Sequence, residues 1–236
     1  MSAQTTIVTV PASRALAWYG DAMRLWKRGP VVMSALGAIT ILSQFVFELW
    51  PEAGSLLAKL AVPLIACGML YAAQATERGE RARLAHALYA FRAGAGAIGA
   101  IIVSSAITFL AEWAAADSLA GVDLMRPGSP APDLDLATVL AIYAVGILAS
   151  LPMSLVPLAA LFGGEGFARS FATSLRAFAR NPGAFLVYGV VALALLAIGL
   201  ATMGIGLVIA LPLIACATFA AWREVCPGEA TPSAPA

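Results

Sequence analysis

Five long runs without a single charged residue set the strongest limit on what this chain can fold into. They cover residues 29–47, 60–76, 93–111, 136–164 and 181–222. One helix of about 20 residues crosses the hydrocarbon core of a bilayer, so four of the runs fit one helix each. The last run fits two helices joined by the glycine-containing turn at 203–206, because glycine permits tight turns. The sequence therefore predicts transmembrane helices at 31–50, 55–75, 94–116, 137–162, 184–202 and 205–222.

The composition agrees with an all-α polytopic membrane protein. Apolar residues make up 61% of the 236 residues and charged residues 11%, against about 45–50% and about 25% in ordinary soluble domains. We expect one integral membrane domain over 1–236. Its last residues, 225–236, are rich in proline and small polar residues and are predicted to form a disordered tail.

Basic residues gather on one side of the predicted membrane. That side has Arg14, Arg24, Lys27, Arg28, Arg78, Arg81, Arg83, Arg92, Arg169, Arg176, Arg180 and Arg223, whereas the other side has Arg126, with Lys59 at the edge of the second span. Cytoplasmic loops of membrane proteins carry the excess of Lys and Arg. We therefore expect a bacterial inner-membrane protein with both termini in the cytoplasm. The net charge of +1 gives no reason to expect a nucleic-acid partner.

A short sequence recurs in the second, fourth and sixth spans and predicts an internal repeat. The segments VPLIAC, VPLAA and LPLIAC place Pro63, Pro157 and Pro212 at equivalent positions. The units cover about 12–76, 82–163 and 165–224, each with an amphipathic helix, a span, an external turn and a proline-bearing span. Parallel repeats are related by an axis along the membrane normal. The prolines are interpreted as packing kinks, or alternatively as sites where freed carbonyl groups line a transport cavity.

Each unit begins with apolar residues at helical spacing. These stripes are Leu16, Tyr19, Met23 and Trp26; Leu84, Leu88 and Phe91; and Phe167, Phe171, Leu175 and Phe178. Two interpretations remain open: the stripes lie in the membrane interface among anionic headgroups, or they pack on the protein's own bundle. In the first case Trp26, Phe91, Phe171 and Phe178 are interfacial anchors. Thr173 lies off its stripe and should tolerate a charge better than Phe171.

The chain resembles a family of uncharacterised six-span inner-membrane proteins of proteobacteria. The residues that carry the likeness are the RNPGAFLVYG stretch at 180–189 and the ending with Gly204, Leu211-Pro212 and Ala221-Trp222-Arg223. The family is YciC-like and related to the membrane domain attached to some glycerophosphodiester phosphodiesterases. The resemblance implies the topology and location, and no activity.

No residue pattern in the sequence indicates an enzyme, a cofactor or a metal site. Cys67, Cys216 and Cys226 lack metal-ligand spacing, and His86 is the sole histidine. Lys59 is expected to extend to the outer surface or to pair with Glu48 or Glu52. We therefore expect a non-enzymatic scaffold or accessory factor that acts through helix and lipid contacts, with a membrane protein partner or a second copy. The alternative is a small transporter or lipid-handling permease.

Overall fold

The computed structural model describes residues 6–50, 54–123 and 134–227, and every regular element in them is a helix. The α-helices are α1 (Arg14–Lys27), α2 (Pro30–Glu48), α3 (Gly54–Glu77), α4 (Ala95–Ala120), α5 (Leu136–Ser150), α6 (Val156–Leu161), α7 (Phe167–Arg180), α8 (Pro182–Ala201) and α9 (Leu207–Val225). Two 3₁₀ helices complete the order, η1 (Leu84–Arg92) before α4 and η2 (Leu151–Met153) between α5 and α6.

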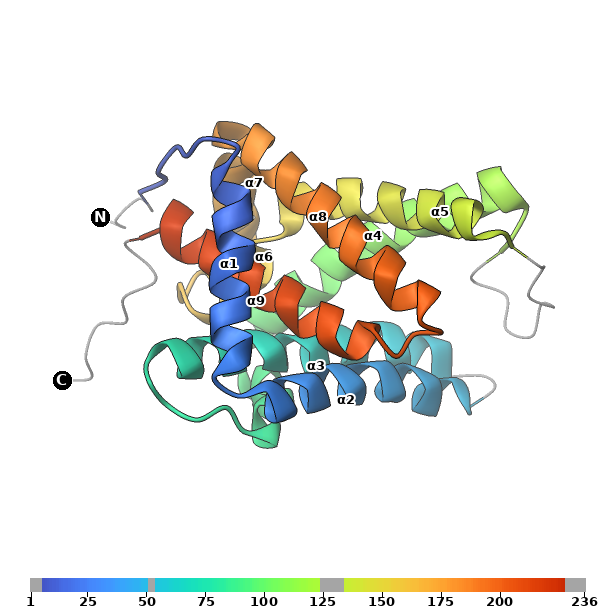
Figure 1. The fold of residues 1–236 in the computed structure, drawn as a ribbon, viewed down its shortest axis with the longest axis horizontal. Coiled ribbons are helices and arrows are strands. Elements are labelled where there is room, and N and C mark those ends of the chain that lie inside the picture. The colour runs from blue at the N-terminus through green and yellow to red at the C-terminus, as the bar shows by residue number, and fades with distance from the viewer. Residues whose placement is uncertain (1–5, 51–53, 124–133, 228–236) are drawn as a thin grey trace.

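In the described ranges, six helical segments are long and apolar enough to cross a membrane, which confirms the predicted fold class. Five are the single helices α2, α3, α4, α8 and α9, and the sixth is the combined segment Leu136–Leu161. The long helices lie along the longest axis of the molecule, whereas α1 crosses their ends (Figure 1). This arrangement fits a multi-pass membrane protein with one end of the bundle covered by shorter helices.

The fourth span lies where it was predicted, at Leu136–Leu161, but it is not one continuous helix. The structure divides it into α5, η2 and α6, because Pro152 has no N–H to continue the hydrogen-bond ladder. Ser174 on α7 compensates for the break: its hydroxyl donates to the carbonyl of Pro152 at 2.8 Å and accepts from the N–H of Leu155 at 3.1 Å. The broken backbone is thus held by a side chain from a neighbouring helix.

The predicted disordered tail begins too early. Val225 is the last residue of α9, and both Val225 and Cys226 are fully buried. The N–H of Val8 donates to the carbonyl of Val225 at 2.9 Å. The chain is therefore packed up to this point, and residues 228–236 of the predicted tail lie outside the described residues.

The segment before α1 is fixed by Asn181, which sits between α7 and α8. The amide oxygen of Asn181 accepts from the N–H of Val10 at 2.7 Å, and its amide nitrogen donates to the carbonyls of Val8 and Ala177, each at 3.1 Å. Arg180 adds a hydrogen bond to the carbonyl of Ile7 at 3.1 Å. Asn181 is only 2% exposed, so one side chain joins the chain's first described residues to its last third.

Two glycines allow close approach of helices. A Cβ added at Gly37 on α2 would lie 2.8 Å from the carbonyl oxygen of Val208 and 3.1 Å from Cδ of Pro212 on α9. One added at Gly68 on α3 would lie 2.6 Å from Cα of Ala87 on η1. Such contacts between backbones are typical of small residues at membrane helix interfaces.

Candidate functional site: the collar

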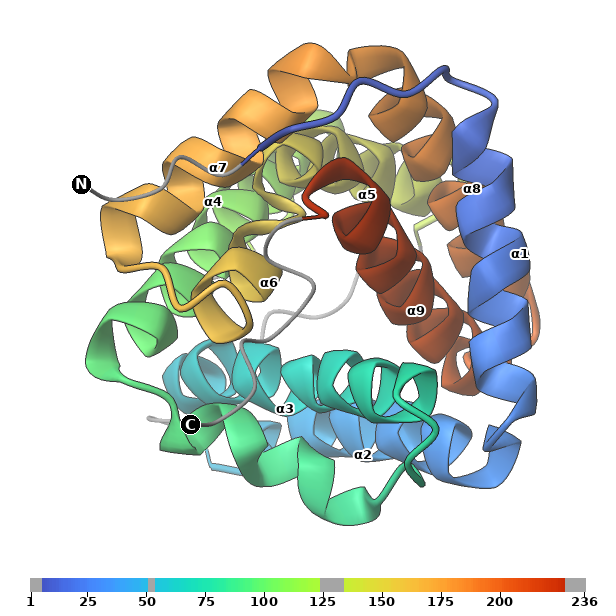
Figure 2. The ribbon, with the colours of Figure 1, turned by 90° about the vertical axis from the view of Figure 1, so that its left-hand side faces the viewer.

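Three short segments enclose one end of the bundle, and we call α1, η1 and α7 the collar. Figure 2 views this end directly: α1 lies along one side, α7 along another, and η1, the green segment, along the lower edge. The end of α9 and the short helix α6 lie inside this frame. Each collar segment directly precedes a membrane-length helix, which places the collar at the boundary of the apolar bundle.

Helix α7 has three distinct faces. Ser170, Thr173, Ser174 and Ala177 are buried against the bundle. Of the stripe, Phe167 and Leu175 are each 43% exposed, and Phe171 and Phe178 are partly buried. Arg169, Arg176 and Arg180 each lie nine residues from a stripe phenylalanine, which is about two and a half turns and therefore the opposite side of the helix. The face of small residues therefore packs on the bundle. The aromatic stripe and the arginines lie on opposite sides of the helix.

Helix α1 repeats this pattern. Its buried residues are Ala15, Trp18, Ala22 and Leu25. The stripe lies on another face, where Leu16 is 60% and Met23 is 37% exposed. In both helices the stripe follows the buried face by roughly 100° around the axis. Units related by rotation about the membrane normal keep this order, and the repeat remains a prediction that this observation supports.

The second collar segment was expected as an α-helix and is instead the 3₁₀ helix η1. With three residues per turn, Leu88 and Phe91 share one face and Ala87 and Ala90 another. Leu88 is 60% and Phe91 42% exposed, whereas the two alanines are buried. The segment therefore also places small residues on the protein and large apolar residues outside, although Leu84 belongs to the alanine face.

The predicted anchors have different surroundings. Phe91 is exposed, whereas Trp26 and Phe178 are half-buried and pack on the main core, and Phe171 packs on the smaller cluster formed by α4 and α6. Trp26 also donates from its indole nitrogen to the hydroxyl of Ser34 at 3.2 Å. The expectation for Thr173 is wrong: it is fully buried and donates to a carboxylate oxygen of Glu165 at 3.1 Å.

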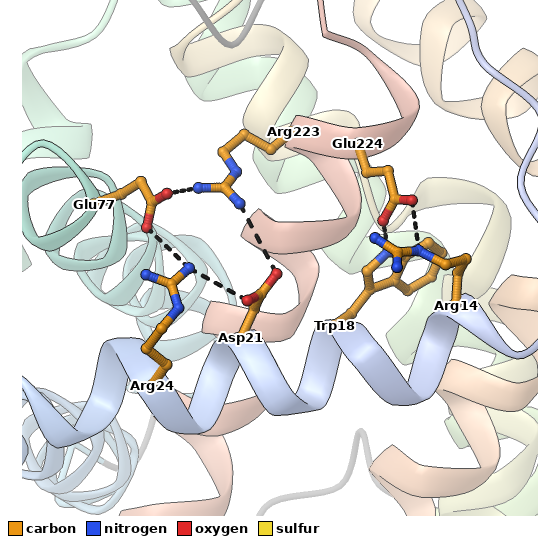
Figure 3. A network of polar contacts seen from close by, with 7 residues as sticks. All are labelled: Arg14, Trp18, Asp21, Arg24, Glu77, Arg223 and Glu224. Atoms are coloured by element: carbon orange, nitrogen blue, oxygen red, sulfur yellow. Dashed lines mark hydrogen bonds and ion pairs between the residues drawn. The ribbon is translucent and has the colours of Figure 1, made fainter.

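Charged residues connect α1 to α3 and α9 at the collar end (Figure 3). Glu224 on α9 accepts from Nε of Arg14 at 2.7 Å and from the indole nitrogen of Trp18 at 2.8 Å. Glu77 at the end of α3 pairs with Arg223 and, at 3.4 Å, with Arg24.

Asp21 closes the network. Its carboxylate lies 3.3 Å from Arg24 and 3.9 Å from Arg223. These side chains are partly exposed, so each pair contributes modestly to stability. Positive and negative side chains alternate in this network, which joins α1, α3 and α9. Its main effect is therefore to fix the orientation of α1 on the bundle. The pairs between helices could not be predicted from the sequence, because their partners lie far apart in the chain. Asp21 is the one sequence signal, as an acid on the cationic face of α1.

The positions of the three prolines favour the packing interpretation. Pro63 and Pro212 lie inside α3 and α9, and Pro157 lies in the first turn of α6. Pro212 is buried and faces Gly37. None of the three lines the cavities described below.

An ionisable pair lies within the spans, toward the end of the bundle that is opposite the collar. The ammonium group of Lys59 on α3 sits 3.3 Å from the ring centroid of Phe109 on α4 and interacts with the charge of Glu112. Glu112 occupies the space that the absent side chain of Gly146 leaves on α5, and with Tyr143 it lines a cavity of about 200 Å³. Lys59 therefore reaches α4. Of its predicted partners, Glu52 and the side chain of Glu48 lie outside the described residues.

The three cysteines and the single histidine are the remaining side chains with nucleophile or metal-ligand chemistry. Cys67, Cys216 and Cys226 are buried, and no three His, Cys, Asp or Glu side chains gather in the described ranges as a metal site. Burial, followed by the charge of Arg83, lowers the pKa of His86 from its usual value. His86 is thus held neutral, and its Nδ1 accepts from the N–H of Arg83 at 3.3 Å.

No protein-family model, curated protein or solved structure matches the chain. Its function must therefore be argued from the collar and the bundle themselves.

Proposed function

We propose that this protein is a non-enzymatic scaffold or accessory factor of the bacterial inner membrane, which acts through its collar. The supporting observation is that all three collar segments pack one face on the bundle and leave large apolar residues outside. Leu16, Leu88 and Leu175, one from each segment, are 60%, 60% and 43% exposed. A soluble surface rarely carries such apolar stripes in a ring, and they match the membrane interface or a membrane protein partner.

The charges of the collar suit a surface of anionic lipid. In α7 the arginines are opposite the aromatics, which is the distribution of an interfacial helix with its apolar side in the acyl boundary and its cations among headgroups. The positive-inside rule then places the collar on the cytoplasmic side. The proposed partners are anionic lipid and one membrane protein, either a different protein or a second copy of this chain.

Gentle detergent extraction tests the proposal with two variants of α7. Leu175→Glu places a charge on the exposed stripe, and Ala172→Glu places the same charge on an exposed position outside it. We expect a discrete membrane protein or an enriched anionic lipid to copurify with the wild type and with Ala172→Glu. Leu175→Glu should lose at least half of it, because a carboxylate is costly in the acyl boundary. Equal retention by both variants would contradict the collar as the interacting surface.

The second candidate function is a small transporter or lipid-handling permease. The observation on its side is the carboxylate of Glu112 beside Lys59 and Tyr143 at a cavity within the spans, since ionisable groups inside a membrane usually mark function. Saturable solute binding by the purified protein, lost in Glu112→Gln, would favour the transporter over the scaffold.

A further inference from the structure

We propose that a cavity between η1 and the bundle binds the phosphate group of a membrane lipid. The cavity has a volume of about 320 Å³. Its polar lining is Tyr71 from α3 with Tyr89 and Arg92 from η1, and its apolar lining includes Ala97, Ala160 and Leu161. It lies at the collar end, where a headgroup would be found if the collar follows the interface.

An arginine at the end of each collar segment, or directly after it, provides the first argument. Arg28, Arg92 and Arg180 stand at corresponding places, directly before the turn into α2, α4 and α8. Arg28 donates to the carbonyl of Thr76 at 3.3 Å, and Arg180 donates to that of Ile7 at 3.1 Å. Arg92 differs: among residues 6–50, 54–123 and 134–227 it has no hydrogen-bond partner, and its Cζ lies 5.9 Å from the centroid of the Tyr89 ring. Its guanidinium donors are therefore available to a ligand in the cavity.

The two tyrosines provide further donors. Their rings are in edge contact at a centroid distance of 5.5 Å. Both tyrosines therefore line the same wall of the cavity. Neither hydroxyl forms a hydrogen bond within the described part of the chain. One guanidinium and two hydroxyl groups at one cavity, without a lining carboxylate, match a singly charged phosphodiester.

The approach to the cavity is open at Gly94. This residue is the N-cap of α4, with an extended backbone at φ −62° and ψ 152°, and a Cβ added to it would meet no atom within 4 Å. The start of α4 adds a favourable potential for an anion. Gly94 lines the cavity, so a side chain there would extend into open space at its wall without disturbing the packed protein.

The apolar part of the lining favours a lipid over free phosphate. Ala97 and Ala160 belong to the small cluster of α4 and α6, and Leu161 packs against it. A glycerol backbone and the start of an acyl chain can lie against these residues while the phosphate meets Arg92. Inorganic phosphate would leave this apolar wall uncovered.

The test measures the affinity of the purified full chain for phosphatidylglycerol in vesicles of otherwise zwitterionic lipid. Arg92→Gln removes the guanidinium, and Gly94→Leu places a large side chain at the wall of the cavity. Arg81→Gln is the matched control, because Arg81 is exposed and lines a different groove. We expect Arg92→Gln to weaken binding about tenfold, as loss of one charge-assisted hydrogen bond predicts. Gly94→Leu should weaken binding by steric hindrance, and Arg81→Gln should change it less than twofold.

Two outcomes would overturn the proposal. Equal losses in Arg92→Gln and Arg81→Gln would show diffuse attraction to the anionic surface instead of a site. Release of the lipid by millimolar inorganic phosphate would assign the cavity to the free ion. If Gly94→Leu fails to fold, the comparison of the two arginine variants still decides. Because the site uses none of the stripe residues, its failure leaves the result for Leu175→Glu unaffected.

Discussion

Gly68→Ala should destabilise the protein by about 1–3 kcal/mol, the usual cost of overpacking, although it adds a single methyl group. The new Cβ would lie 2.6 Å from Cα and 2.8 Å from the backbone nitrogen of Ala87, and 3.0 Å from the carbonyl carbon of His86. These are backbone atoms of η1, so no side chain can move aside to make room. We expect η1 to shift away from α3 and thermal unfolding in detergent to begin at lower temperature.

Gly20→Ala provides the matched control with an expected effect of opposite sign. Gly20 lies within α1, and a Cβ there meets nothing within 4 Å. Alanine is a better helix former than glycine by up to about 1 kcal/mol, so this variant should unfold at the same or a higher temperature. A neutral Gly68→Ala would contradict the close packing of η1 on α3.

Thr173→Glu should be among the most damaging single changes in the chain. Thr173 is fully buried and donates to Glu165, which is itself only 8% exposed. The substitution removes this donor and buries a second carboxylate next to the first. Breaking a buried polar pair and adding a like charge beside a buried carboxylate costs about 3–5 kcal/mol. We expect loss of folded protein after extraction, measured as the monodisperse fraction and as the unfolding temperature.

Two controls separate the buried charge from other causes. Thr173→Ser keeps the hydroxyl and should cost about 1 kcal/mol for the lost methyl group. Ala172→Glu introduces the same charge at the neighbouring exposed position and should leave the unfolding temperature nearly unchanged. A stable Thr173→Glu protein would mean that this face of α7 does not pack on the bundle.

The example of Thr173 shows what the sequence could predict in the collar. Helical spacing identified the large apolar residues correctly, and Leu16, Leu88 and Leu175 are indeed exposed. The buried face of α7 consists instead of small residues such as Ala177, which allow close approach and carry little hydrophobic signal, whereas α1 buries Trp18 and Leu25 beside Ala15 and Ala22. In α7 the periodicity of large side chains therefore marks the outer face and gives no sign of the small-residue face that packs on the bundle.

The membrane-length helices were predictable because length and hydropathy decide them locally. The side-chain hydrogen bonds that link these helices were not predictable. The hydrogen bonds of Ser174 to the break after α5 and of Asn181 to the segment before α1 join residues far apart in the chain. The same is true of Glu224 with Arg14 and Trp18. The break itself could have been predicted from Pro152, since proline removes a backbone donor inside a helix.

The accessibility of spin labels at the three exposed leucines tests the collar most directly. Labels at Leu16, Leu88 and Leu175 in lipid vesicles should collide more often with oxygen, which concentrates in the bilayer, than with a water-soluble nickel complex. Labels at the exposed control positions Lys27 and Arg176 should show the reverse order. This result would place all three stripes in the membrane interface or against an apolar partner. Preferential collision of the three stripe labels with the nickel complex would show that the collar faces water, and would contradict the account.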